Sequence, residues 1–156
     1  MKSIKGNLIT LSQDGRYDVI IHGCNCFVNM GAGIAKSIKQ AYPEAYIADL
    51  TTIKGDKKKL GTYTQAIATL KDSSQLTIIN AYTQYDFRGY KNTVNVDYKA
   101  LGKCFRNLKN EFGNKQLRFG FPLIGAGLAG GDWSLIKSII EAELYDEDIE
   151  LVIFKK

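Results

Sequence analysis

Two glycine-rich segments offer the clearest chemistry in this sequence, because both place bare backbone where a helix is expected to begin. The first is Met30–Ala35 and the second is Ile124–Gly131. Each follows a strand-like run and precedes apolar residues at helical spacing. Amides at the start of a helix lack acceptors, and the helix dipole is positive there, which favours phosphate oxygens. Two such loops that face each other suit a diphosphate better than a single phosphate.

The sequence does not support more specific nucleotide-binding or phosphatase motifs in these loops. The span Gly125–Gly130 matches G-x-G-x-x-G, but it follows a late strand and not the first βαβ unit. It also lacks a clear acidic partner that closes a second strand about 20 residues on, so dinucleotide binding is not expected. No Gly-Lys-Ser/Thr follows either loop, which excludes a P-loop NTPase. A cysteine-nucleophile phosphatase needs an arginine-bearing phosphate loop, and no arginine lies between Cys24 and Arg88.

Two residues are candidates for acid–base catalysis. His22 is the only histidine, and histidine is the side chain whose ordinary pKa lies near neutrality. It ends the strand-like run Asp18–His22, where a structural role is equally open. Asp97 lies where a later helix is expected to begin. There its carboxylate can instead serve as a charge at the helix N-terminus.

The length of the chain indicates a single domain over residues 1–156. No apolar run approaches the roughly 18 residues of a membrane span, and the N-terminus lacks a signal peptide, so we expect a cytoplasmic protein without a membrane partner. Three cysteines and one histidine suit neither a disulfide framework nor a metal site. The net charge of +5 favours anionic partners. Nucleic acid is not expected among them, because the run Lys57–Lys59 is short and is interpreted as a solvated loop.

Strand-like and helix-like segments alternate along the chain, which predicts an α/β fold with a sheet covered on both faces. Helices are expected from about residue 32 to 42, over 96–112 and over 136–144. Strands are expected at Asp18–His22, Gly61–Leu70, Leu76–Asn80, Leu117–Ile124 and Glu150–Phe154, with a weaker alternation over Ile4–Leu11.

The order and spacing of these motifs resemble the macro domain family over nearly the whole chain. The matching segments are Lys5–Leu8, Ile21–Cys26, Met30–Ala35, Tyr42–Ala45 and Ile124–Trp133. Their Gly-Asn-Leu and His-x-Cys-Asn pieces are most similar to the ADP-ribose 1″-phosphate phosphatase branch, with its fungal, phage and bacterial relatives. The resemblance implies a three-layer α/β/α fold with a mixed central sheet flanked by helices. It also implies a monomer that lies in the host cytoplasm if a phage encodes it.

The resemblance further implies ADP-ribose or a derivative as the small-molecule ligand, with no cofactor and no metal. Gly6, Asn7 and Leu8 would border the adenine. The amide oxygen of Asn7 would accept the adenine amino proton, where many macro domains use an aspartate. Gly23, Cys24 and Asn25 would line the distal ribose, and Tyr82, Tyr85 or Phe87 could cap it. The distal ribose and diphosphate would be held by Met30, Gly31, Ala32, Gly33, Ile34, Ala35, Ile124, Gly125, Ala126, Gly127, Leu128, Ala129 and Gly130.

The activity that this resemblance implies is hydrolysis of ADP-ribose 1″-phosphate by a phosphoric monoester hydrolase, with His22 and Asp97 as catalytic candidates. A non-catalytic ADP-ribose-binding module and a hydrolase of O-acyl or protein-linked ADP-ribose esters are the alternatives, with RNA or poly(ADP-ribose) binding through surface lysines as a third. Some macro relatives remove ADP-ribose from acidic side chains with a lysine and an aspartate. Gln84 and Ala129 stand at the matching positions here, which disfavours that reaction.

Overall fold

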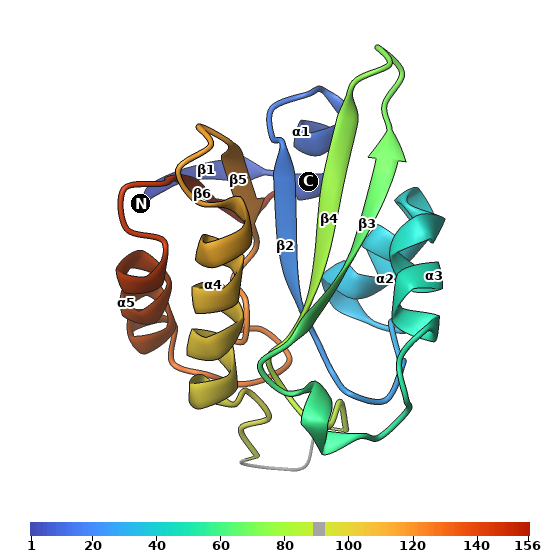
Figure 1. Ribbon diagram of the computed structural model, residues 1–156, viewed down its shortest axis with the longest axis vertical. Coiled ribbons are helices and arrows are strands. Elements are labelled where there is room, and N and C mark those ends of the chain that lie inside the picture. The colour runs from blue at the N-terminus through green and yellow to red at the C-terminus, as the bar shows by residue number, and fades with distance from the viewer. Residues whose placement is uncertain (89–92) are drawn as a thin grey trace.

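A mixed sheet lies at the centre of the molecule (Figure 1). The structure is a computed structural model that describes residues 1–88 and 93–156. Within these residues the sheet has six strands in the order β1-β6-β5-β2-β4-β3, and only β3 runs antiparallel to its neighbour. The strands are β1 (Lys2–Gly6), β2 (Val19–Cys24), β3 (Tyr63–Thr69), β4 (Gln75–Tyr82), β5 (Arg118–Phe121) and β6 (Asp148–Phe154).

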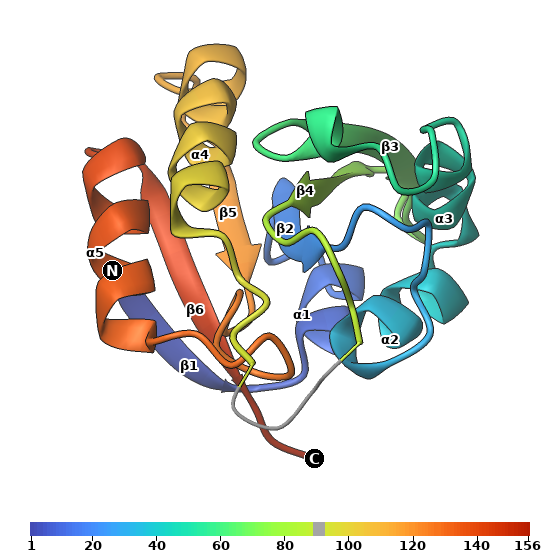
Figure 2. The ribbon, with the colours of Figure 1, turned by 90° about the horizontal axis from the view of Figure 1, so that it is seen from below.

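Helices cover both faces of this sheet, which confirms the predicted three layers. Figure 2 shows α4 (Tyr98–Phe112) and α5 (Trp133–Glu143) on one side of the strands. On the other side lie α1 (Leu8–Gln13), α2 (Gly33–Ala41) and α3 (Pro43–Leu50). In the part of the chain that the structure describes, no helix is long and apolar enough to cross a membrane.

Strand β2 contributes to both apolar cores, because successive side chains of a strand point to opposite faces. Val19 and Ile21 pack with the residues of α4 and α5, whereas Ile20 packs with those of α1, α2 and α3. Burial on both faces explains why this run is continuously apolar, as is usual for a central parallel strand. The run therefore lies in the middle of the sheet, and its carboxyl end opens onto the loops.

The first predicted strand is shorter than expected. The segment Ile4–Leu11, whose weak alternation predicted a strand, is extended only as far as Gly6, and the chain then turns into helix α1. Asn7 causes this change, because its side-chain oxygen accepts hydrogen bonds from the amides of Ile9 (2.9 Å) and Thr10 (3.3 Å). This is the geometry of a helix N-cap. Asn7 and Leu8 therefore do not lie on the first strand.

Proline sets two other boundaries that differ from the prediction. Helix α2 ends at Ala41 as expected, but Pro43 then opens the short helix α3, which the sequence pattern did not separate. Proline is tolerated in the first turn because that amide needs no partner within the helix. Strand β5 stops at Phe121 because Pro122 follows it and has no N–H to donate to the sheet.

The basic run Lys57–Lys59 forms a short 3₁₀ turn. Lys57 and Lys58 are exposed, as predicted for a solvated loop, but Lys59 is buried. Its ammonium group donates to the carbonyl oxygen of Cys26 at 3.1 Å and lies 4.7 Å from the centre of the Tyr82 ring. The prediction of a fully solvated run is therefore wrong for Lys59, which anchors the segment after β2.

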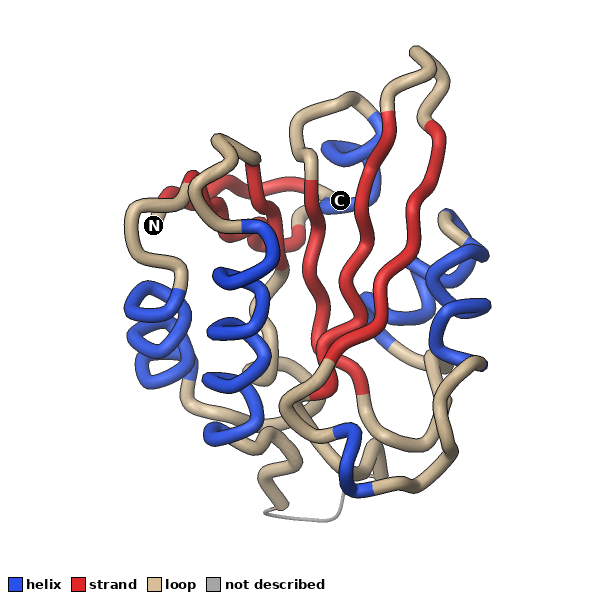
Figure 3. Tube along the Cα trace, viewed as in Figure 1, coloured by secondary structure: helices blue, strands red, loops and turns tan. Residues whose placement is uncertain are grey.

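All strands except β3 run in the same direction, so the loops that follow them meet at one edge of the sheet (Figure 3). Ligands of open α/β sheets bind outside the carboxyl ends of such strands. The loops that leave β2 and β5 at this edge are the two glycine-rich segments.

Candidate functional site

A cleft of about 570 Å³ opens at this edge, between the start of α2 and the loop from β5 to α5. Its lining comes from the segment after β1, the loop after β2, the start of α2, the segment after β4, the second glycine loop and the end of β6. The lining residues are Asn7, Leu8, Ile9, Gly23, Cys24, Asn25, Asn29, Ala32, Gly33, Ile34, Ala35, Ser37, Gln84, Phe87, Pro122, Leu123, Ile124, Gly125, Gly127, Leu128, Ala129, Val152 and Phe154.

The start of α2 presents amides to this cleft without a capping side chain. Ala32 is the N-cap residue and makes no side-chain hydrogen bond to the helix. Gly33 has a φ of +58°, a left-handed conformation that glycine adopts without strain. Within residues 1–88 and 93–156, the amides of Gly33, Ile34 and Ala35 donate to no acceptor. The first helix turn is therefore free to bind an anion.

The second glycine loop is folded by its own backbone. The amide of Gly130 donates to the oxygen of Gly127 at 3.1 Å, and that of Gly131 donates to the oxygen of Gly125 at 2.7 Å. Gly125 and Gly130 have φ angles of +72° and +71°. These turns expose the amides of residues 127–129, which have no acceptor in the described part of the chain. Consecutive free amides form a concave anion site.

The two loops meet across the cleft. A Cβ atom built on Gly33 would lie 3.5 Å from Cδ1 of Leu128. Both loops also line the cleft through Ala32, Ile34, Ile124 and Ala129. Two arrays of free amides thus face the same space, which is the arrangement expected for a diphosphate.

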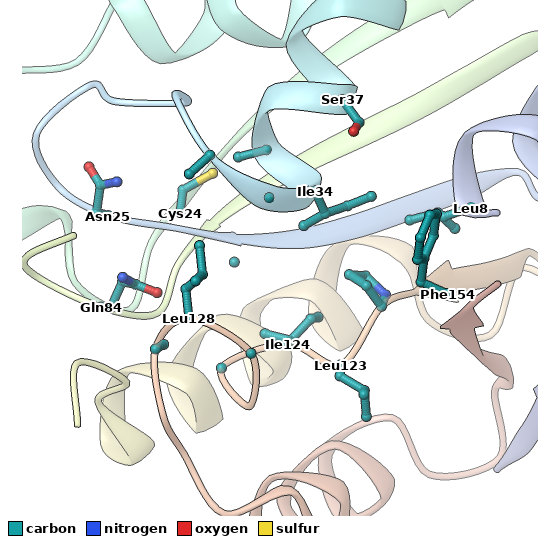
Figure 4. Close-up of a pocket in the computed structure, with 18 of the residues that line it drawn as sticks. Leu8, Cys24, Asn25, Ile34, Ser37, Gln84, Leu123, Ile124, Leu128 and Phe154 are labelled. Atoms are coloured by element: carbon teal, nitrogen blue, oxygen red, sulfur yellow. The ribbon is translucent and has the colours of Figure 1, made fainter. Parts of the chain in front are cut away.

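The two ends of the cleft differ in polarity (Figure 4). Leu8 and Phe154 lie at one end, and Phe154 is 68% exposed. An exposed aromatic ring beside aliphatic side chains offers a flat apolar surface. Asn25, Cys24 and Gln84 lie at the other end, where amide groups can meet hydroxyls. A ligand with a planar ring at one end and a sugar at the other would match both.

Asn25 shapes the polar end instead of presenting free groups to it. Its side-chain nitrogen donates to the oxygen of Asn29 at 2.8 Å, and its oxygen accepts from the amide of Phe27 at 2.9 Å. The Gln84 nitrogen donates to the oxygen of Asp86 at 2.8 Å. In the described residues, the Gln84 oxygen and the Asn29 nitrogen keep no partner, so these two atoms can contact a ligand.

His22 does not line the cleft, although its Nε2 lies 3.5 Å from the Sγ of Cys24, which does. The His22 side chain is fully buried, and its Nε2 lies 2.7 Å from the side-chain oxygen of Asn80. Asn80 donates through its nitrogen to the oxygens of Ala45 and Thr64, so its own oxygen accepts and the His22 Nε2–H donates. Burial lowers the pKa of His22 to about 4, although the hydrogen bond to Asn80 opposes the shift. This neutral, enclosed imidazole argues against the predicted catalytic role.

Asp97 also lies outside the lining of the cleft. It is the N-cap residue of α4, and its carboxylate accepts from the amide of Ala100 at 2.9 Å. Its own amide donates to the oxygen of Thr83 at 2.8 Å, which joins the start of α4 to the end of β4. These contacts correspond to the capping role that the sequence left open, and they give the catalytic prediction for Asp97 no geometric support.

The described lining of the cleft contains no acidic side chain, no basic side chain and no histidine. Its one thiol, Cys24, is buried, and burial raises the pKa of that thiol well above its ordinary value. Among residues 1–88 and 93–156, no group of three or more histidine, cysteine or acidic side chains could hold a metal ion. Anion binding in this cleft thus depends on backbone amides.

Most residues predicted to bind the ligand are brought together here. Those that line the cleft are Asn7, Leu8, Gly23, Cys24, Asn25, Ala32, Gly33, Ile34, Ala35, Ile124, Gly125, Gly127, Leu128 and Ala129. Gly6, Met30, Gly31, Ala126 and Gly130 do not, and Met30 is instead part of the core under α2. Of the three aromatic candidates near the polar end, Phe87 lines the cleft, whereas Tyr82 is fully buried and Tyr85 donates to the oxygen of Gly55.

Several lining residues carried no signal in the sequence. They are Ile9, Asn29, Ser37, Pro122, Leu123, Val152 and Phe154. The end of β6 reaches the cleft because β6 lies beside β1, a pairing between the two ends of the chain. Asn29 could have been found, since it directly precedes the first glycine loop.

The fold and the cleft together define an α/β domain with two facing loops of anion-binding amides. The family model described as Macro domain matches residues 21–140. The chain therefore belongs to the macro domain family, as its motifs predicted.

Comparison with known proteins supports this assignment. The chain is 36% identical over 157 residues to an uncharacterized 17.5 kDa protein of Enterobacteria phage T4, with 98% of this chain and 94% of that protein covered. A shorter stretch of 46 residues is 48% identical to the ADP-ribose 1″-phosphate phosphatase of Aspergillus oryzae, over 30% of this chain and 21% of that protein.

Solved structures show the same fold at low sequence identity. The macrodomain of Thermus aquaticus DarG is similar with a TM-score of 0.73 at 20% identity, and 99% of this chain and 97% of that chain are covered. Thermosipho africanus DarTG in complex with ADP-ribose is similar with a TM-score of 0.71 at 17% identity, over 98% of this chain and 42% of that chain.

Proposed function

We propose that this chain binds ADP-ribose or a derivative of it in the cleft between the two glycine loops. The observation that carries the proposal is the pair of facing amide arrays, from residues 33–35 and 127–129, set between an apolar end and a polar end. Membership of the macro domain family and the ADP-ribose complex of a structural relative support the choice of ligand.

The polarity of the cleft gives the ligand its orientation. The diphosphate would lie between the loops, the adenine against Leu8 and Phe154, and the distal ribose near Asn25 and Gln84. An aromatic ring and aliphatic side chains favour a base, whereas amide groups favour sugar hydroxyls. This orientation places the C1″ position of the distal ribose near Phe87 and Cys24, at the end of the cleft that lies beyond the diphosphate.

We further propose ADP-ribose 1″-phosphate as the derivative that the chain hydrolyses. The short match to the fungal phosphatase supports this step. Among the described residues the lining has no charged acid or base, so the proton for the leaving sugar oxygen would come from the phosphate monoanion itself. The bond from phosphorus to the C1″ oxygen would break, and water would add to phosphorus and pass one proton to a phosphoryl oxygen, giving ADP-ribose and the dihydrogen phosphate anion. Such transfers depend mainly on positioning and electrostatic stabilisation.

Titration calorimetry with ADP-ribose tests the binding proposal, and its failure with folded protein would overturn it. Phosphate release from ADP-ribose 1″-phosphate tests the hydrolysis. Because the reactive form is the monoanion, the rate should fall as the pH rises through the second phosphate pKa of about 6. Binding without any release would instead indicate a non-catalytic ADP-ribose-binding module. The uncharged lining favours this module as the second candidate function.

A further inference from the structure

Asn7 lies at the apolar end of the cleft. Its two polar side-chain atoms differ in whether they already have a hydrogen-bond partner among the described residues. Its oxygen is already used, because it accepts from the amides of Ile9 and Thr10 at the start of α1. Both partners are N–H donors, so the atom that they contact must be the oxygen and not the amide nitrogen. In the described residues the Asn7 nitrogen has no acceptor, and Asn7 lines the cleft. Its free group is a donor.

The neighbouring backbone, in the part of the chain that the structure describes, adds a second free donor. The amide of Leu8, in the first turn of α1, has no acceptor in the described part of the chain. The carbonyl oxygen of Gly6 already accepts from the amide of Lys155 at 2.8 Å. Ser37 reaches this end from α2 (Figure 4), and its hydroxyl can donate or accept. The fixed free groups here are therefore donors.

We infer that the free donor of Asn7 makes the base subsite independent of the 6-amino group of adenine, so that it accepts a 6-keto purine about equally well. A 6-amino group is a donor and would face the donor of Asn7. A 6-keto oxygen is an acceptor and would pair with it, while N1, which is an acceptor in adenine, becomes an N–H donor in the 6-keto purine and could no longer accept from the Leu8 amide. This inference rests on the proposed function, because it assumes that a purine diphosphate ribose occupies the cleft with its base at the apolar end.

The test compares two ligands that differ only at the base. ADP-ribose and its hypoxanthine analogue, inosine diphosphate ribose, are titrated into the protein by calorimetry. We expect the analogue to bind within about threefold of ADP-ribose, because one hydrogen bond is gained at O6 and one is lost at N1. A preference for ADP-ribose of more than about threefold overturns the inference and leaves the proposed function standing. Absence of binding by both ligands overturns the proposed function and the inference with it.

Asn7→Asp supplies the matching variant. Aspartate caps helices as well as asparagine does, so α1 should be retained, and its second carboxylate oxygen would accept from an amino group and repel a keto oxygen. The ratio of the two affinities should shift toward ADP-ribose by about tenfold, and an unchanged ratio overturns the inference. The ratio also cancels any general repulsion between the new charge and the diphosphate.

Asp132→Asn is the control, because Asp132 caps α5 outside the lining of the cleft. It makes the reverse exchange at a helix N-cap and should leave the affinity ratio unchanged. Thermal unfolding of both variants verifies that the caps are kept. If Asn7→Asp does not fold, the comparison of the two ligands on the unaltered chain still decides the inference.

Discussion

A side chain at Gly127 should remove ligand binding without unfolding the protein. A Cβ atom built on Gly127 would meet nothing within 4 Å, because it points into open space. Gly127 is also absent from the glycines with positive φ, so the backbone accepts other residues there. We therefore expect Gly127→Val to change the free energy of unfolding by no more than about 0.5 kcal/mol.

The loss of affinity should nevertheless be large. The amides of residues 127–129 would each donate a charge-assisted hydrogen bond to the diphosphate, worth about 1.5–3 kcal/mol apiece. A branched side chain that keeps the phosphate from two of them would cost about 3–6 kcal/mol, which is at least a hundredfold in the dissociation constant. Calorimetry with ADP-ribose measures this loss, and thermal unfolding verifies that the fold is retained.

Gly125→Ala is the contrasting control. Gly125 has a φ of +72°, and its added Cβ would lie 2.7 Å from Cγ2 of Val96. This variant should lower the melting temperature, in contrast to Gly127→Val. If Gly127→Val binds ADP-ribose within about threefold of the unaltered chain, the diphosphate does not lie against this loop and the proposed site is wrong.

Three further outcomes follow from the described contacts. Phe154→Ala should weaken ADP-ribose binding by roughly fivefold, the effect of losing about 1 kcal/mol of ring contact, while the melting temperature stays nearly unchanged because the ring is largely exposed. Asp97→Asn keeps the cap of α4 and should leave phosphate release unchanged; a rate at the level of buffer alone would restore Asp97 as a catalytic residue. Because burial lowers the pKa of His22 to about 4, protonation favours the unfolded chain, so stability should be full above pH 6.5 and should fall by roughly 3 kcal/mol as the pH drops to 4. Chemical denaturation from pH 7.5 to 4 should show a flatter slope for His22→Gln, and equal slopes would mean that His22 titrates normally.

The layers of the fold could be predicted from the sequence because each long element carries a clear period. Residues 98–112 show one apolar stripe, and its members Leu101, Phe105 and Leu108 are fully buried against the sheet. Short elements carry too few residues to show a period. Helix α1 was therefore interpreted as strand, although Asn7 carries the capping signal in its residue type.

The centre of the candidate site could also be predicted, since free amides follow directly from a strand, a glycine loop and a helix. The apolar end could not, because Val152 and Phe154 reach it only through the pairing of β6 with β1. His22 shows a different limit of prediction from the sequence. Its position at a strand end indicates proximity to the cleft, but its hydrogen-bond partner Asn80 comes from β4 and is itself bonded to the oxygen of Ala45 in α3. Sequence order does not reveal these contacts.

The donors proposed to hold the diphosphate belong to the main chain, and this makes that part of the site unusual in its response to mutation. Exchange of the side chain at Ile34 or Leu128 for any residue other than proline leaves the amide N–H in place, so most substitutions do not delete these donors. The vulnerable positions are Gly127, where an added side chain would cover the amides, and the glycines with a left-handed backbone, Gly33, Gly125 and Gly130. Insertions that change the path of the loops would have the same effect. Lineages of this chain could therefore exchange most of the side chains around the cleft and still offer a ligand the same amides.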